Sequence, residues 1–172
     1  MRMPPGEVFR SRRPFPHLVI DDFLDGEFRD ALEREFPAFD PSQAVNELGA
    51  VGGKATYPDV KSLGPAFARF DAKMRSPEFL AEVGRLTSIE KLLCDPDYVG
   101  GGAHLNMSGQ DLDMHVDFNF HPRTRRHRRL NLILFLNRRW EESWGGNLEL
   151  HLDPRLAREE DEVVRVVPAF NR

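Results

Sequence analysis

The sequence predicts an α+β domain in which helices come first and short strands follow. Before Pro96 the apolar residues recur at helical spacing, whereas the chain after it contains several short strand-like runs. Thirteen prolines and thirteen glycines favour short strands joined by turns. This order favours a sandwich or jelly roll built from the later strands. We expect a single domain over 1–172, with a strand and helices in 1–95 and the first part of the jelly-roll core in 96–172.

The N-terminal half is expected to hold one strand and three helices. The expected elements are a strand at 15–24, helices at 26–36 and 63–74, a loop at 37–61, and a third helix beginning at Ser76-Pro77. "FPHLVIDDFL" is apolar and β-branched in its middle, which predicts the strand. Asp25 has the position of a helix N-cap, and proline after Ser76 suits a first helical residue.

The C-terminal half is expected to hold mainly strands. Those expected lie at 130–137, 147–152 and 162–168, after the strand-like polar run "DMHVDFNF". "LNLILFLN" lacks alternation, which predicts burial on both faces, whereas "NLELHL" alternates. Gly145 and Gly146 are expected to form a tight turn into the following strand. Trp140 and Trp144 are expected to be packing anchors.

Composition excludes several classes of function. A net charge of −4 argues against a nucleic-acid partner. A membrane span needs a run of about 18 apolar residues, and none exists, so no membrane partner is expected. The N-terminus lacks the apolar core of a signal peptide. Cys94 is the single cysteine, which fits a reducing cytoplasm, and we expect it to be a packing residue.

The run "DLDMHVDFNFHP" (111–122) carries the strongest chemical signal. On a strand, residues two apart project to the same face, so His115 and Asp117 would point together. Non-haem Fe(II) oxygenases bind iron through two histidines and one carboxylate, which leaves positions open for a cosubstrate and O₂. A His-x-Asp triplet also occurs by chance. From these residues alone, the run is either a polar loop or part of a metal site.

The order of motifs after His115 resembles a known family. His-x-Asp, "RRLNLILFLN", Trp140 and "GGNLEL" follow one another as in the 2-oxoglutarate- and Fe(II)-dependent oxygenase superfamily, specifically its prolyl 4-hydroxylase-like branch. The similarity runs from about Gly101 to Arg172, and "PHLVIDDFL" resembles the opening strand of that branch. The resemblance implies a double-stranded β-helix, a jelly-roll barrel with the N-terminal helices packed on one side.

The resemblance also implies an activity. The family couples oxidative decarboxylation of 2-oxoglutarate to hydroxylation, here of an amino-acid or peptidyl side chain such as proline. Fe(II), 2-oxoglutarate and O₂ are the implied cofactors, with ascorbate as an optional addition. The implied partner is a small-molecule or peptide substrate.

The family's site residues carry over to five positions. His115 and Asp117 match the proximal iron ligands, and an aspartate at 117 resembles a hydroxylase rather than a halogenase. Phe135 stands where many relatives have a tyrosine that binds the cosubstrate. Asn131, on the same face of the expected strand, either offers an amide to the cosubstrate or is satisfied by backbone. Leu148 either lines the cosubstrate pocket or belongs to the core.

The family also requires a second histidine and then an arginine that pairs with the far carboxylate of 2-oxoglutarate. His151 is the only histidine well after Asp117, and its alternation places it opposite Leu148, so we expect a surface or interstrand role for it. Arg165 lies in an ordinary strand. "EVVRVVPAFNR" resembles the point before the next core strand. The remaining core strands and the third ligand are therefore expected beyond Arg172, and this chain alone is expected to bind Fe(II) weakly and to turn over little substrate.

The loop "RTRRHRR" (123–129) holds five arginines and has three interpretations: a nucleic-acid patch, a substrate-binding loop, or a solvated loop paired to nearby carboxylates. In the second, Arg125 and Arg126 hold an acidic or carboxylate-bearing substrate. His121 and His127 are expected at the surface. Two rival functions also remain open: a non-catalytic jelly-roll remnant or cupin-like binding module, and a half-domain completed by a second chain.

Overall fold

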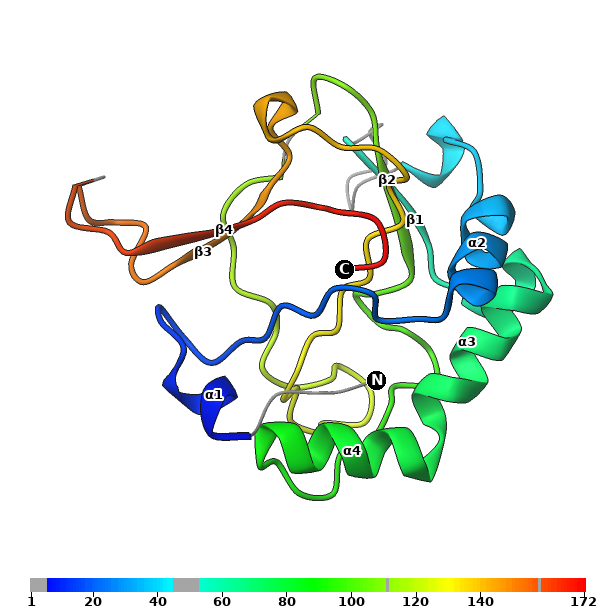
Figure 1. The fold of residues 1–172 in the computed structure, drawn as a ribbon, viewed down its shortest axis with the longest axis horizontal. Coiled ribbons are helices and arrows are strands. Elements are labelled where there is room, and N and C mark those ends of the chain that lie inside the picture. Colours follow the sequence, from blue (N-terminus) through cyan, green and yellow to red (C-terminus); the bar gives the residue numbers. More distant parts are fainter. Residues whose placement is uncertain (1–5, 45–52, 111, 158) are drawn as a thin grey trace. The chain divides into compact units, whose positions relative to one another are not determined.

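Figure 1 shows a computed structural model of the chain, which describes residues 6–44, 53–110, 112–157 and 159–172. The chain divides into two compact units, and each is assembled from segments that are distant in the sequence. The first unit comprises Met1–Glu33, Pro77–Leu92 and Asn131–Arg172, and the second comprises Arg34–Ser76 and Leu93–Leu130. Each unit is described by itself.

The first unit combines helices with one antiparallel strand pair. Its elements are α1 (Gly6–Ser11), most of α2 (Gly26–Glu35), α4 (Pro77–Thr87), β3 (Leu148–His151) and β4 (Val163–Val166). β3 pairs with β4 from Leu148 opposite Val166 to His151 opposite Val163. Helix α4 presents an apolar side, and the rings of Phe23 and Phe79 meet edge to face with centroids 6.3 Å apart. The unit therefore joins its first and middle segments by aromatic packing.

The second unit holds the other strand pair and one long helix. β1 (Lys54–Tyr57) pairs antiparallel with β2 (Ala103–Asn106), and α3 spans Pro65–Arg75. The α3 N-terminus has no side-chain cap of its own. Instead, the Glu35 carboxylate accepts hydrogen bonds from the backbone N–H groups of Ala66, at 2.7 Å, and Phe67, at 3.3 Å. A carboxylate there satisfies orphan donors and complements the helix dipole.

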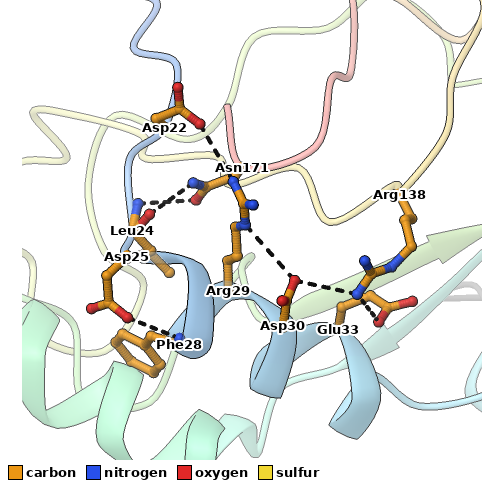
Figure 2. Close-up of polar contacts among 9 residues, drawn as sticks. All are labelled: Asp22, Leu24, Asp25, Phe28, Arg29, Asp30, Glu33, Arg138 and Asn171. Atoms are coloured by element: carbon orange, nitrogen blue, oxygen red, sulfur yellow. Dashed lines mark hydrogen bonds and ion pairs between the residues drawn. The ribbon is translucent and has the colours of Figure 1, made fainter.

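Asn171 joins two ends of the first unit (Figure 2). Its side-chain amide accepts from Leu24 N at 2.9 Å and donates to Leu24 O at 2.9 Å. Its backbone oxygen accepts from Phe23 N at 3.0 Å, and its side chain is fully buried. Asp25 caps α2, as predicted, by accepting from Phe28 N at 2.9 Å. The segment before α2 is therefore held by the C-terminal segment rather than by a strand ladder.

A cluster of charged side chains lies along α2, near the hydrogen bonds between Asn171 and Leu24 (Figure 2). Arg138 lies 3.3 Å from the Asp30 carboxylate and 3.0 Å from that of Glu33. The guanidinium groups of Arg29 and Arg138 both lie over the Phe170 ring, at 5.3 and 5.0 Å from its centroid. The Phe170 ring therefore contacts both α2, through Arg29, and the segment that carries Arg138.

The turn into β3 forms as the sequence predicts. Gly145 and Gly146 have φ angles of 75° and 63°, a region that favours glycine. The indole Nε1 of Trp140 donates to Gly145 O at 3.1 Å, and the Trp140 and Trp144 rings meet edge to face. A Cβ at Gly146 would lie 2.9 Å from the Trp140 ring, so the close approach also requires glycine.

The three predicted helices are confirmed. Helices α2, α3 and α4 lie within one or two residues of the expected positions, and strands β3 and β4 fall inside the expected runs. The strand predicted at 15–24 is wrong, because that segment forms no ladder. The loop predicted at 37–61 contains β1, and α1 was not expected.

The segment 130–137 also differs from the prediction that both of its faces are buried. Leu132 and Ile133 are each 48% exposed, and the segment is not assigned as a strand. Its Phe135 backbone N–H donates to Arg172 O at 3.0 Å and its carbonyl accepts from Asn171 N at 2.8 Å. Burial on both faces requires other elements packed over each face, and the exposure of these two side chains shows that the described residues do not cover the segment in this way.

The described residues thus form a mixed fold of helices and two small antiparallel sheets. This confirms the α+β class, while the double-stranded β-helix stays a prediction. Among the described helices, none combines the length and apolar content that crossing a bilayer requires.

Candidate metal centre

His115 and Asp117 face each other in the second unit. Nε2 of His115 lies 3.7 Å from Oδ1 of Asp117, and the two side chains are 52% and 39% exposed. The run 112–119 is not assigned as a strand, and one antiparallel bridge, between Phe120 and His127, closes the turn that follows it. The same-face placement expected from the two-residue spacing is present without the expected ladder.

A backbone contact fixes the orientation of the His115 ring. Its Nδ1 lies 2.7 Å from the carbonyl oxygen of Asp113. A carbonyl only accepts, so Nδ1 carries the hydrogen, and in the neutral ring Nε2 keeps its lone pair. Metal-binding histidines usually have this arrangement, in which the second nitrogen donates to a carbonyl or carboxylate. The ring nitrogen that faces Asp117 is therefore the one able to bind a metal.

The separation of the two donor atoms fits a single metal ion. Ligand atoms at about 2.1 Å from one ion are at most about 4.2 Å apart. The 3.7 Å between His115 Nε2 and Asp117 Oδ1 is within that limit. Imidazole nitrogen and carboxylate oxygen are the two kinds of ligand atom in the three-residue site of non-haem iron oxygenases. Within the described part of the chain, no group of three or more His, Cys, Asp or Glu side chains gathers to hold a metal.

Arg128 is a site neighbour that reasoning from the sequence did not single out. Its Nη2 lies 3.1 Å from Asp117 Oδ2, and its side chain is 17% exposed. The guanidinium carbon lies 4.7 Å from the centroid of the Phe118 ring. The only available signal was position: Arg128 stands near the end of the basic loop, two residues before the apolar run that begins at Leu130.

His121 is buried, so its predicted surface role is wrong. Its Nδ1 accepts hydrogen bonds from the backbone N–H groups of Arg123, at 3.2 Å, and Thr124, at 3.0 Å. Its Nε2 lies 3.4 Å from the Asp95 carboxylate. The imidazole thus satisfies the donors of a tight turn, which a sequence pattern does not reveal.

The rest of the basic loop is exposed. Arg125 and Arg126 lie on the turn that His121 organises: Arg125 N donates to His121 O at 2.9 Å and His121 N donates to Arg126 O at 2.8 Å. Arg123 forms an ion pair with Asp97 at 2.8 Å. Pairing with nearby carboxylates, one of the three interpretations of this loop, is therefore confirmed for Arg123 and Arg128. His127 is exposed, as expected.

The three residues expected near the cosubstrate belong to the first unit. Asn131 is exposed, whereas Phe135 and Leu148 are partly buried. Leu148 lies in β3 opposite Val166. His115 and Asp117 belong to the second unit, so a shared pocket for these five residues stays a prediction.

His151 pairs with carboxylates of its own hairpin. Its Nδ1 lies 2.6 Å from Asp161 Oδ2 and its Nε2 lies 3.3 Å from Glu149 Oε2. Glu149 also accepts from Arg165 on the facing strand, at 2.7 Å. The histidine and Glu149 therefore share one side of β3, the side opposite Leu148 and Leu150.

This pairing predicts a pH-dependent contribution to stability. The hydrogen bond to Asp161 raises the pKa of His151 above its ordinary value. The pKa of the Asp161 carboxyl is lowered, first by the hydrogen bond from the Asp153 backbone N–H and then by the one to His151. The contribution is complete below about pH 6.5, where the unfolded histidine is also protonated, and is lost as pH rises through the raised pKa. Urea unfolding of the unsubstituted chain and His151→Gln, at about pH 5.5 and about pH 9, should show a stability difference that shrinks at the higher pH. An equal difference at both values would contradict the pairing.

A comparison with known families matches the C-terminal part of the chain. Residues 102–172, which contain His115, Asp117 and Arg128, match the model of the 2OG-Fe(II) oxygenase superfamily. The match supports a dioxygenase-type oxidoreductase that uses Fe(II), 2-oxoglutarate and O₂ and acts on a small-molecule or peptide substrate. The chain has no significant match among the curated proteins or the solved structures.

Proposed function

We propose that this chain carries part of the iron centre of an Fe(II)- and 2-oxoglutarate-dependent hydroxylase of the prolyl 4-hydroxylase-like branch. The substrate is an amino-acid or peptidyl side chain such as proline, and His115 and Asp117 are the proximal iron ligands. One observation carries the proposal: in the segment that matches the family, His115 turns a ring nitrogen with a free lone pair toward Asp117 Oδ1, at 3.7 Å.

The residues would divide the work as follows. When bound, iron and 2-oxoglutarate supply the oxidative chemistry. His115 and Asp117 hold the metal on one side. Asn131, Phe135 and Leu148 orient the cosubstrate, with Phe135 giving an apolar wall where a tyrosine would give a hydroxyl. Arg125 and Arg126 hold an acidic or carboxylate-bearing part of the substrate.

The single-domain organisation, the double-stranded β-helix and a third ligand belong to the same proposal. A second histidine and an arginine that pairs with 2-oxoglutarate are part of the proposed centre. The apolar residues that alternate with the ligand pair are the support for this fold. Leu112, Met114 and Val116 form an apolar set that is exposed in this structure, and the Val116 side chain is 90% exposed. A jelly-roll strand would bury such a face against its neighbours.

Anaerobic titration with Fe(II) and 2-oxoglutarate tests the proposal. The 172-residue chain should bind Fe(II) weakly, and both His115→Ala and Asp117→Ala should lower its affinity by at least about tenfold. His127→Ala is the matched control, because this exposed histidine lies in the neighbouring basic loop and its loss should leave Fe(II) affinity unchanged. If the two ligand variants bind Fe(II) as tightly as the control, the proposed centre is wrong. Succinate formation from 2-oxoglutarate then tests the catalytic assignment.

A further inference from the structure

We propose that Arg128 is a positioning residue for the Asp117 carboxylate. It holds Oδ2, so that Oδ1 stays turned toward His115 and serves as a single-oxygen metal ligand. This inference rests on the proposed iron centre and adds a residue to it that binds neither metal nor substrate.

The two oxygens of Asp117 have different neighbours. Oδ1 lies 3.7 Å from His115 Nε2, whereas Oδ2 lies 3.1 Å from Arg128 Nη2. An aspartate without such a partner turns about two side-chain torsions and presents either oxygen, or both, to a metal. Because the guanidinium engages Oδ2, the oxygen turned toward the ring nitrogen of His115 is Oδ1. The contact therefore selects which atom of Asp117 binds and in which direction it points.

Arg128 is itself well held, as a positioning group must be. Its guanidinium lies over the Phe118 ring, 4.7 Å from the centroid, and its side chain is 17% exposed. Its backbone N–H donates to Asn119 O at 2.8 Å, next to the bridge between Phe120 and His127. The turn of the chain thus brings an arginine eleven residues downstream back to the carboxylate.

A glycine makes room for this arrangement. Gly100 has a φ angle of 71°, and a Cβ there would lie 2.9 Å from the Phe118 ring and 3.4 Å from Arg128 Nη1. The ring and the guanidinium therefore pack against bare backbone. This close approach limits how far the Arg128 side chain can move away from Asp117.

Arg128 has two opposing effects on metal affinity. Its positive charge repels a cation, which lowers affinity, whereas a fixed ligand direction raises it. The metal-facing side chains are 52% and 39% exposed, so water weakens the charge effect. Water does not weaken the effect of a fixed direction of the Asp117 oxygen in the same way. Removing partners that orient metal ligands usually costs about 10–100-fold in affinity, so we expect the orientation effect to prevail.

The test is titration of the 172-residue chain with Co(II), followed by calorimetry and by the visible spectrum of the bound ion. Arg128→Ala should weaken binding by about 10–100-fold and change the spectrum, because Asp117 then offers both oxygens. Arg128→Lys keeps the charge but loses the planar guanidinium that stacks on Phe118. Its affinity for Co(II) should lie between those of the unsubstituted chain and Arg128→Ala. Arg129→Ala is the matched control: this neighbouring arginine is exposed, and its removal should change neither result.

Each outcome decides the inference. If His115→Ala binds Co(II) as tightly as the unsubstituted chain, the proposed centre falls and the role of Arg128 falls with it. If His115→Ala weakens binding but Arg128→Ala binds equally or more tightly, the centre stands and the positioning role is overturned. Should Arg128→Ala unfold, Phe118→Leu removes the supporting ring without changing charge, and unchanged affinity there overturns the inference.

Discussion

Replacing Asn171 with alanine is expected to lower the free energy of unfolding by about 3 kcal/mol. The substitution leaves the N–H and C=O groups of Leu24 without the amide that satisfies both of them (Figure 2). Leu24 is itself buried, so water does not replace the lost partner freely. Each buried backbone group left unpaired costs about 1–3 kcal/mol. Urea unfolding followed by circular dichroism measures the loss.

Two further substitutions separate the causes. Asn171 has a φ angle of 64°, where alanine is strained by about 1–2 kcal/mol and glycine is not. Asn171→Gly should therefore lose less than Asn171→Ala, and its loss reports the hydrogen bonds alone. Asn137→Ala is the matched control, because its partly buried amide makes one 3.2 Å bond to Pro168 O and should cost about 1 kcal/mol. If Asn171→Ala lowers the free energy of unfolding no more than Asn137→Ala does, the hydrogen bonds between Asn171 and Leu24 contribute little.

Replacing Asp71 with alanine is expected to cost the second unit about 3 kcal/mol. The Asp71 side chain is 8% exposed and accepts from Arg75 Nε at 2.7 Å and from the Tyr98 hydroxyl at 3.0 Å. Burial and the adjacent carboxylate raise the pKa of Tyr98, so its hydroxyl remains a donor at neutral pH. Removing the buried carboxylate leaves the charge of Arg75, whose side chain is 27% exposed, without its partner, and this is the main source of the loss.

Asp71→Asn tests this explanation, since it keeps an acceptor for Tyr98 but removes the charge. It should recover part of the loss caused by alanine. The control pair is Glu82 and Arg85 on α4, which are close in sequence like Asp71 and Arg75 but largely exposed. Exposed pairs contribute about 0–1 kcal/mol, so Glu82→Gln should change stability little. Equal losses for Asp71→Ala and Glu82→Gln would rule out the role given to burial.

The helices were predictable because their signals are local. Asp25 caps α2 and Pro77 opens α4, and neither signal depends on distant residues. Strands depend on partners elsewhere in the chain. "KATY" becomes β1 because Ala103–Asn106 lies beside it, whereas the more strand-like 15–24 is joined to Asn171 by isolated bonds.

In the candidate site too, the features set by local spacing were predictable from the sequence, whereas those set by distant contacts were not. A spacing of two residues was sufficient to bring His115 and Asp117 together, because it depends on the backbone alone. The contacts of Arg128 and the burial of His121 follow from how the loop turns back, which composition does not specify. Charge in this loop suggested solvent or substrate but did not indicate that Arg128 would pair with Asp117.

The alternation around the metal pair also limits how the gene can change. His115 and Asp117 lie on one side of a run whose intervening residues, including Met114 and Val116, are exposed and apolar. Inserting or deleting a single residue between 113 and 117 would exchange the two sets, because the side-chain period is two. Methionine and valine would then stand where the donors stood. A substitution at Met114 or Val116 would therefore leave the two donors in place, whereas a change of length within this run would displace them.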